Sequence, residues 1–80
     1  MTRDSSGFVS GDTRTTQIGY VNRNQQRCDG HRGVAGTDHG QRSYRMHCLV
    51  CGYTYGANGT DVFQRRCPRP HGGGLPGIDF

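Results

Sequence analysis

Apolar and polar side chains alternate most regularly between residues 41 and 50. Successive side chains of a strand point to opposite faces of a sheet, so this period of two indicates a strand with one buried face. The apolar face would carry Tyr44, Met46, Cys48 and Val50. The polar face would carry Ser43, Arg45 and His47. The pattern therefore predicts a strand over residues 41–50.

Shorter patterns predict a hairpin before this strand and one more strand after it. The β-prone runs 17–22 and 25–28 flank a polar turn at 23–24. The triplet 53–55 has the β propensity for a short strand. The Asn-Gly pair inside 56–59 is typical of a turn. We therefore expect a small β-rich unit with several tight turns.

Long stretches of the chain carry loop signals. Residues 29–40 hold four glycines, and residues 71–80 combine a glycine triplet with Pro-Gly, so both are expected to be loops. Residues 1–15 are polar and aperiodic, with one apolar pair at 8–9 that can dock elsewhere. We expect them to form a disordered tail, which leaves residues 16–80 as the domain.

The segment 60–66 allows two interpretations. Thr60 or Asp61 can cap a single helical turn that Pro68 closes. A strand fits the same residues almost as well. We predict at most one short helical turn in the whole fold, and we place it in this segment.

The composition excludes a fold that depends on a large apolar core. Leu, Ile, Val and Phe make up 12 of 80 residues, which is 15%, and glycine makes up 14. Chains below about 20% of these four apolar types tend to be disordered unless something else holds them, and short chains commonly use disulfides or metals for this purpose. Large multidomain enzymes, membrane-spanning proteins and helical bundles are therefore excluded as fold classes.

The charge favours an acidic partner. Ten Arg and no Lys stand against six Asp and no Glu, which gives a formal net charge of +4. Guanidinium groups match phosphate oxygens in a bidentate manner, and nucleic acid is the commonest acidic partner of a basic protein. A GC-rich genome is an alternative explanation for the choice of Arg over Lys.

Cysteine and histidine spacing predicts a metal site. Cys48 and Cys51 form a C-x2-C pair followed by Gly52, and Cys67 with His71 forms a C-x3-H pair sixteen residues later. Two such pairs can surround one tetrahedral Zn²⁺, and the glycine lets the chain turn under the sulfurs. The expected cofactor is therefore one structural zinc ion, and the expected fold class is a small β-rich zinc ribbon.

Other uses of the same residue types remain open. Cys28 and His31 also have ligand spacing. They could replace Cys67 and His71 as the second pair, or Cys28 alone could replace His71. They could also form a second site with His39 or His47. Two disulfides are a further alternative, although no signal peptide is visible. Outside a metal site, Cys28 would be a small buried apolar residue.

Several short stretches form a recognisable set: GTDHGQ at 36–41, CLVCGY at 48–53, YGANGTD at 55–61, RRCP at 65–68, GG at 73–74 and PG at 76–77. Together they resemble a group of short bacterial zinc-ribbon proteins, some of them encoded near defence genes. The resemblance covers about residues 15–78 and implies a zinc ribbon with a role in DNA transactions. Those proteins usually read C-P-x-C, where this chain reads Cys67-Pro68-Arg69-Pro70-His71.

The leading functional hypothesis is a module that binds nucleic acid or assists a nucleic-acid-processing system. Basic residues near the metal ligands would contact phosphates, and nearby tyrosines would either stack on bases or form the small core. The predicted contact residues are Arg45, Arg65, Arg66 and Arg69. The tyrosines in question are Tyr44, Tyr53 and Tyr55.

Two further functions are kept as alternatives. A protein-binding adaptor or inhibitor would use the zinc ribbon as its docking surface. A small metal-dependent nuclease would use Asp38, His39 and Asn58, but the motif lacks a preceding cysteine pair, so catalysis is less favoured. No apolar run suits a membrane span and no secretion signal is visible, so we expect a cytoplasmic protein without membrane contact.

Overall fold

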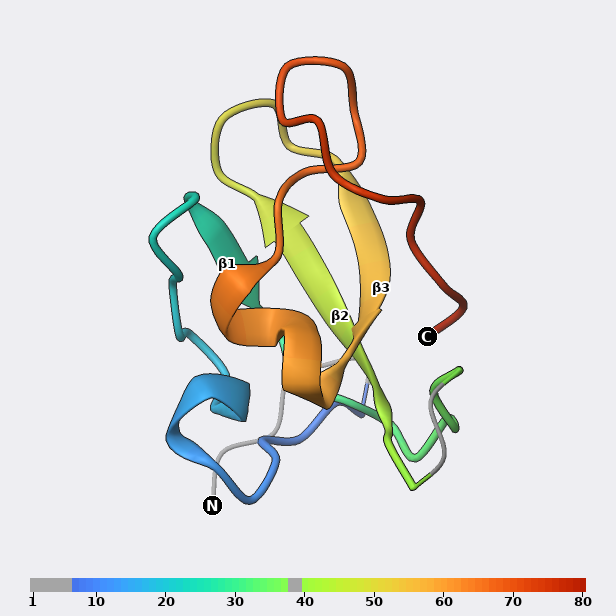
Figure 1. The fold of residues 1–80 in the computed structure, drawn as a ribbon. Coiled ribbons are helices and arrows are strands. Elements are labelled where there is room, and N and C mark those ends of the chain that lie inside the picture. Colours follow the sequence, from blue (N-terminus) through green and yellow to red (C-terminus); the bar gives the residue numbers. More distant parts are fainter. Residues whose placement is uncertain (1–6, 38–39) are drawn as a thin grey trace.

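The computed structural model describes residues 7–37 and 40–80. Its centre is an antiparallel sheet of three strands in the order β1-β2-β3 (Figure 1). The strands are β1 (Gln26–Cys28), β2 (Ser43–Cys48) and β3 (Thr54–Asn58). Two short 3-10 helices accompany them, η1 (Arg14–Thr16) and η2 (Gly59–Gln64). The predicted small β-rich fold is confirmed.

The regular alternation in the middle of the chain forms β2, as predicted. Tyr44, Met46 and Cys48 are buried on one face of this strand. The strand ends at Cys48, two residues earlier than predicted, because a tight turn begins directly after it. Val50 therefore lies on that turn with 67% of its surface exposed, instead of continuing the buried face.

The strand β3 is longer than the sequence predicted. Residues 56–58 were expected to turn, but they continue the ladder with β2. Gly56 pairs on its other edge with Ile78, and a Cβ at this glycine would collide with the Ile78 carbonyl oxygen. Glycine is therefore needed for close approach of two backbones, not for a turn. The prediction of a turn at 56–59 is wrong for this reason.

The predicted hairpin before β2 is only partly correct. The run 25–28 contains β1, which begins at Gln26. Residues 17–22 form no strand, and Val21 alone among them makes a β-bridge to β1, with Arg27. Gly19 takes a φ of 95°, which interrupts an extended chain. The Gly19 and Tyr20 backbones still hydrogen-bond to Cys28, so this segment runs beside β1 without becoming regular.

The short helical turn near residue 60 is confirmed as η2, whereas η1 is a second short turn that the sequence did not predict. Its N-cap is Asn58, which precedes the predicted caps Thr60 and Asp61. Val62 is the residue of η2 that is fully buried against the sheet. None of the helices in residues 7–37 and 40–80 is long and apolar enough to cross a membrane.

The N-terminal segment contacts the rest of the chain where the structure describes it. Residues 1–6 lie outside the described part, but Phe8 is only 2% exposed and Val9 forms a β-bridge with His31. The Phe8 ring packs under the Arg45 guanidinium at 4.0 Å. The one apolar pair of this segment therefore docks on the domain, which the sequence allowed. The division into a tail of residues 1–15 and a domain of residues 16–80 stays a prediction.

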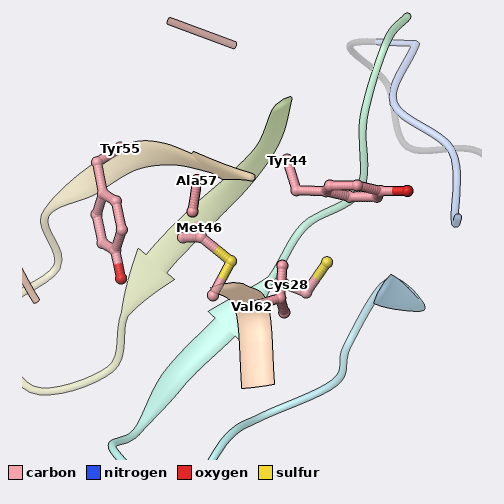
Figure 2. Close-up of a cluster of buried hydrophobic side chains, with 6 residues drawn as sticks. All are labelled: Cys28, Tyr44, Met46, Tyr55, Ala57 and Val62. Carbon is pink, nitrogen blue, oxygen red and sulfur yellow. The ribbon is translucent and has the colours of Figure 1, made fainter. Parts of the chain in front are cut away.

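A small cluster of side chains forms the core between the sheet and η2 (Figure 2). Its members are Cys28, Tyr44, Met46, Tyr55, Ala57 and Val62. Cys28 is fully buried among them, as expected for a cysteine outside the metal site. Tyr44 and Tyr55 belong to the core, whereas Tyr53 is 39% exposed.

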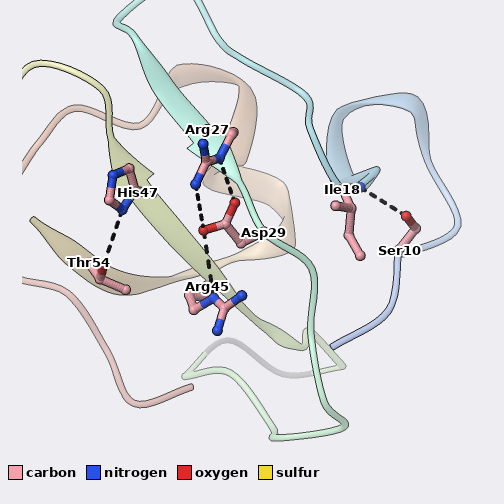
Figure 3. A network of polar contacts seen from close by, with 7 residues as sticks. All are labelled: Ser10, Ile18, Arg27, Asp29, Arg45, His47 and Thr54. Carbon is pink, nitrogen blue, oxygen red and sulfur yellow. Dashed lines mark hydrogen bonds and ion pairs between the residues drawn. The ribbon is translucent and has the colours of Figure 1, made fainter. Parts of the chain in front are cut away.

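The opposite face of the sheet carries polar contacts (Figure 3). Asp29 accepts a hydrogen bond from the Arg27 Nε at 2.7 Å and lies 3.6 Å from the Arg45 Nε. Farther along this face, the His47 ring and the Thr54 hydroxyl are hydrogen-bonded at 3.2 Å. The two faces of the sheet are therefore chemically distinct, and Cys48, the predicted ligand on β2, belongs to the buried one.

Candidate metal centre

The first half of the candidate site is the turn between β2 and β3. Cys48 is the last residue of β2, and its carbonyl accepts a hydrogen bond from the Gly52 amide at 2.8 Å. Gly52 takes a φ of 79°, a conformation that glycine adopts readily and other residues rarely do. This tight turn directs the thiols of Cys48 and Cys51 toward the same point.

The second half comes from the segment that follows η2. The Gly74 amide donates to the Cys67 carbonyl at 2.9 Å, and the Gly72 amide donates to the Arg69 carbonyl at 2.9 Å, so the chain folds back on itself. A Cβ at Gly72 would collide with the Cys67 backbone and side chain. This compact loop brings His71 beside Cys67.

The four predicted ligands meet in one place. The three thiol sulfurs and an imidazole nitrogen all lie within 4.8 Å of one another. The His71 Nε2 atom lies 3.6 Å from the Cys48 sulfur and 3.3 Å from the Cys51 sulfur, and the Cys51 and Cys67 sulfurs lie 3.7 Å apart. A tetrahedral zinc with bonds of about 2.0–2.3 Å separates neighbouring ligand atoms by about 3.5–3.8 Å. This cluster can therefore hold one metal ion such as zinc.

The electrostatics of the thiols favour a cation among them. Burial, and then the nearby Cys51 and Cys48 sulfurs, raise the pKa of Cys67 to about 11, although the Arg69 backbone amide opposes the shift. Burial also raises the pKa of Cys48, but hydrogen bonds from Gln26 and from the turn amides outweigh it and bring this pKa to about 6. The surroundings therefore favour negative charge on the Cys48 sulfur and disfavour it on the Cys67 sulfur. A bound cation would stabilise the thiolate form of both.

One contact of the site had no signal in the sequence. The Gln26 side chain of β1 donates a hydrogen bond from Nε2 to the Cys48 sulfur at 3.2 Å. Gln26 lies 22 residues before that cysteine and belongs to no ligand motif. Only the pairing of β1 with β2, which places Gln26 opposite Cys48, reveals it.

The alternative ligands lie elsewhere. Cys28 is buried in the apolar cluster. His31 packs edge-on against the Tyr44 ring at 5.2 Å, and its Nδ1 accepts the Gly33 amide. His47 bonds the Thr54 hydroxyl on the polar face. All four cysteines are free thiols, so the structure contains neither of the two disulfides of that alternative.

The four arginines predicted to contact nucleic acid have different surroundings. Arg45 lies beside Asp29 and over Phe8, and Arg65 is buried over the Tyr55 ring with a hydrogen bond to the Leu75 carbonyl. Arg66 and Arg69 are exposed near the metal ligands. Contact of any of them with a nucleic acid stays a prediction. Three of them, Arg45, Arg65 and Arg69, already lie over an aromatic ring of the domain.

The nuclease alternative requires three residues, of which the structure describes one. Asp38 and His39 lie outside the described residues. Asn58 is buried, and its side chain bonds the Thr37 backbone amide at 2.9 Å and the Thr37 hydroxyl at 3.0 Å. These bonds give Asn58 a structural role in holding the loop before β2.

Comparisons with protein-family profiles, with curated proteins and with solved structures find no match to this chain. The resemblance to short bacterial zinc ribbons therefore stays a prediction. The cluster of three cysteines and one histidine, and the sheet that supports it, are the features that bear on function.

Proposed function

We propose that this chain is a small zinc-binding module whose fold is held by one structural Zn²⁺ on Cys48, Cys51, Cys67 and His71. The observation that carries the proposal is the convergence of three sulfur donors and one imidazole nitrogen, from two separate segments of the chain, within 4.8 Å. Thiolates and imidazole are the donors that zinc prefers in proteins.

The donor set supports a structural role more than a catalytic one. Catalytic zinc sites commonly use three protein ligands and keep one position for water or substrate, whereas four protein ligands close a tetrahedral ion. The cysteines and the histidine of this chain would tie the β2–β3 turn to the segment after η2. Such a tie contributes directly to folding, which a chain with so few large apolar residues requires.

Metal stoichiometry tests this proposal. Native mass spectrometry of the zinc-loaded chain should find one Zn²⁺ per molecule in the wild type and none in Cys51→Ser. The matched control is Cys28→Ala, which removes a thiol outside the cluster and should still bind one ion. A wild type without zinc at micromolar metal, or equal zinc loss in both variants, would contradict the assignment.

A second candidate function is binding of single-stranded nucleic acid beside the metal centre. The observation that favours it is an exposed pair, in which the Arg69 guanidinium lies 5.3 Å from the centroid of the Tyr53 ring. Exposed Arg66 adds a second positive charge nearby. Arginines for phosphates and an accessible ring for a base are what sequence-tolerant binders use.

Salt dependence tests this second candidate. Binding of a labelled single-stranded oligonucleotide should weaken as salt rises, and the Arg66→Ala/Arg69→Ala variant should reduce the log–log slope by about 1.4, from about 0.7 per phosphate contact. The control Arg14→Ala/Arg32→Ala removes the same charge from arginines that pack over Tyr20 and Phe8. No binding at low salt, or the same loss in both double variants, would overturn this candidate.

A further inference from the structure

A buried amide lies directly behind the metal ligands. Gln26 is 1% exposed, and in the register of the sheet it is the partner of Cys48. Paired residues of antiparallel strands share a face, which explains why the two side chains meet. A buried amide is costly unless its donors and acceptor are paired, so its partners indicate its role.

The partners of Gln26 fix its orientation. Its Nε2 donates to the Cys48 sulfur at 3.2 Å and to the Asn24 carbonyl at 3.0 Å. Its Oε1 accepts a hydrogen bond from the Tyr55 hydroxyl at 2.7 Å. The reversed amide would place Oε1 against the Asn24 carbonyl oxygen and leave the sulfur without a donor, so only one orientation satisfies all three contacts.

The chemistry of β1 changes where the apolar cluster gives way to the metal site. Cys28, two residues along on the same face, packs in the apolar cluster opposite Met46. Gln26 occupies the equivalent place opposite Cys48. The amide therefore stands where an apolar side chain would serve packing alone, and it presents an N–H group to a ligand sulfur.

From this geometry we infer that Gln26 is a positioning residue for the metal centre, held in place by Tyr55. Its N–H···S bond orients the Cys48 sulfur and stabilises negative charge on it, as outer hydrogen bonds do for metal ligands. The Tyr55 hydroxyl prevents the amide from turning away. This inference rests on the proposed function, because it requires that the cluster binds a metal.

The test compares three variants with the wild type. Gln26→Met replaces the amide by an apolar chain of similar length, and Tyr55→Phe removes only the hydroxyl that holds it. Asn58→Leu is the matched control, because it removes a buried amide from the other end of β3, away from the metal ligands. Zn²⁺ affinity is measured by competition with a chromogenic chelator, and Co²⁺ reports the ligand sulfurs through its thiolate charge-transfer band.

We expect Gln26→Met to weaken Zn²⁺ binding by about 10–100-fold, the usual effect of losing an outer-shell partner. Its Co²⁺ charge-transfer band should move to longer wavelength, because a sulfur without the hydrogen bond gives up an electron more easily. Tyr55→Phe should shift both readouts in the same direction by less. Asn58→Leu should leave the band in place, which separates a positioning effect from general destabilisation.

The outcomes distinguish this inference from the proposed function. If the wild type binds neither Zn²⁺ nor Co²⁺, the proposed function fails. If the wild type binds both and Gln26→Met keeps its affinity and band position, the positioning role is overturned and the metal site stands. If Gln26→Met does not fold, Tyr55→Phe decides: unchanged affinity and band in that variant overturn the inference.

Discussion

The two ends of the buried face of this sheet depend on different interactions. Toward the Ser43 end of β2, Tyr44 and Met46 pack with Ala57 and Val62 in an apolar cluster (Figure 2). At the Cys48 end, the neighbouring side chains are ligands and an amide, and the turn beyond them exposes its apolar residues to solvent. One end is stabilised by burial, and the other has donors that can share a metal ion.

This difference shows why the chain needs both ends. The apolar cluster contains only six residues, one of them an alanine and one a cysteine, so the hydrophobic stabilisation it provides is small. The metal end can supply a strong local interaction without burying large side chains. Each end also fixes a different segment, since the cluster holds η2 and the ligands hold the segment after it.

The largest expected effect comes from breaking the metal end. Cys67→Ser removes a buried ligand, and most of the zinc-binding free energy should be lost with it. That free energy is about 10–16 kcal/mol for structural zinc, which matches or exceeds the total stability of about 5–15 kcal/mol of a typical domain. We therefore expect no cooperative thermal transition in this variant by circular dichroism.

Cys28→Ala serves as the control for that experiment, since its thiol lies in the other region. It should keep a cooperative transition in the presence of zinc. A Cys67→Ser protein that melts cooperatively near the wild-type temperature would show that the metal end does not hold the fold.

A smaller effect is expected from the apolar end. Met46→Ala removes a fully buried side chain at the centre of the sheet and should lower the free energy of unfolding by about 2–5 kcal/mol through lost burial and the cavity. Denaturant unfolding in saturating zinc measures it. Val50→Ala changes an exposed residue of the turn between β2 and β3, and it should alter the free energy of unfolding by less than about 0.5 kcal/mol. Equal effects of both changes would contradict the assigned division between the two ends.

The smaller of the two effects expected at the apolar end is a pH dependence. Burial raises the pKa of Cys28 from 9.0 to about 11, so the folded state favours the neutral thiol. This preference stabilises the folded state fully below pH 9. As the pH rises from 9 to 11, the free energy of unfolding should fall by on the order of 2–3 kcal/mol. Denaturant unfolding from pH 8 to 11 should show a shallower decline in Cys28→Ala. Parallel curves for the two proteins would refute this effect.

Local patterns predicted the elements whose neighbours are close in sequence. The alternation around Met46 specified β2 and its buried face, and the C-x2-C and C-x3-H spacings specified all four residues that converge. These features follow from strand pleating and from the reach of a tight turn. They require no knowledge of the rest of the fold.

Features that depend on distant segments were missed. Gly56 is typical of a turn in isolation, but the approach of Ile78 makes it a strand residue. The sequence allowed the apolar pair at 8–9 to dock, but it did not indicate that Phe8 would contact Arg45 and Phe80, which lie far along the chain. Gln26 gave no sign of a role, because its contact with Cys48 exists only through strand pairing.

A zinc titration of the metal-free chain tests the central claim most directly. Amide proton–nitrogen spectra would follow Met46 and Val62 of the apolar cluster while Zn²⁺ is added. The account predicts a poorly dispersed spectrum without metal, and sharp, dispersed resonances for both residues that reach full intensity at one equivalent. Dispersed resonances of the cluster in the absence of metal, unchanged by zinc, would contradict the claim that a metal ion holds this fold.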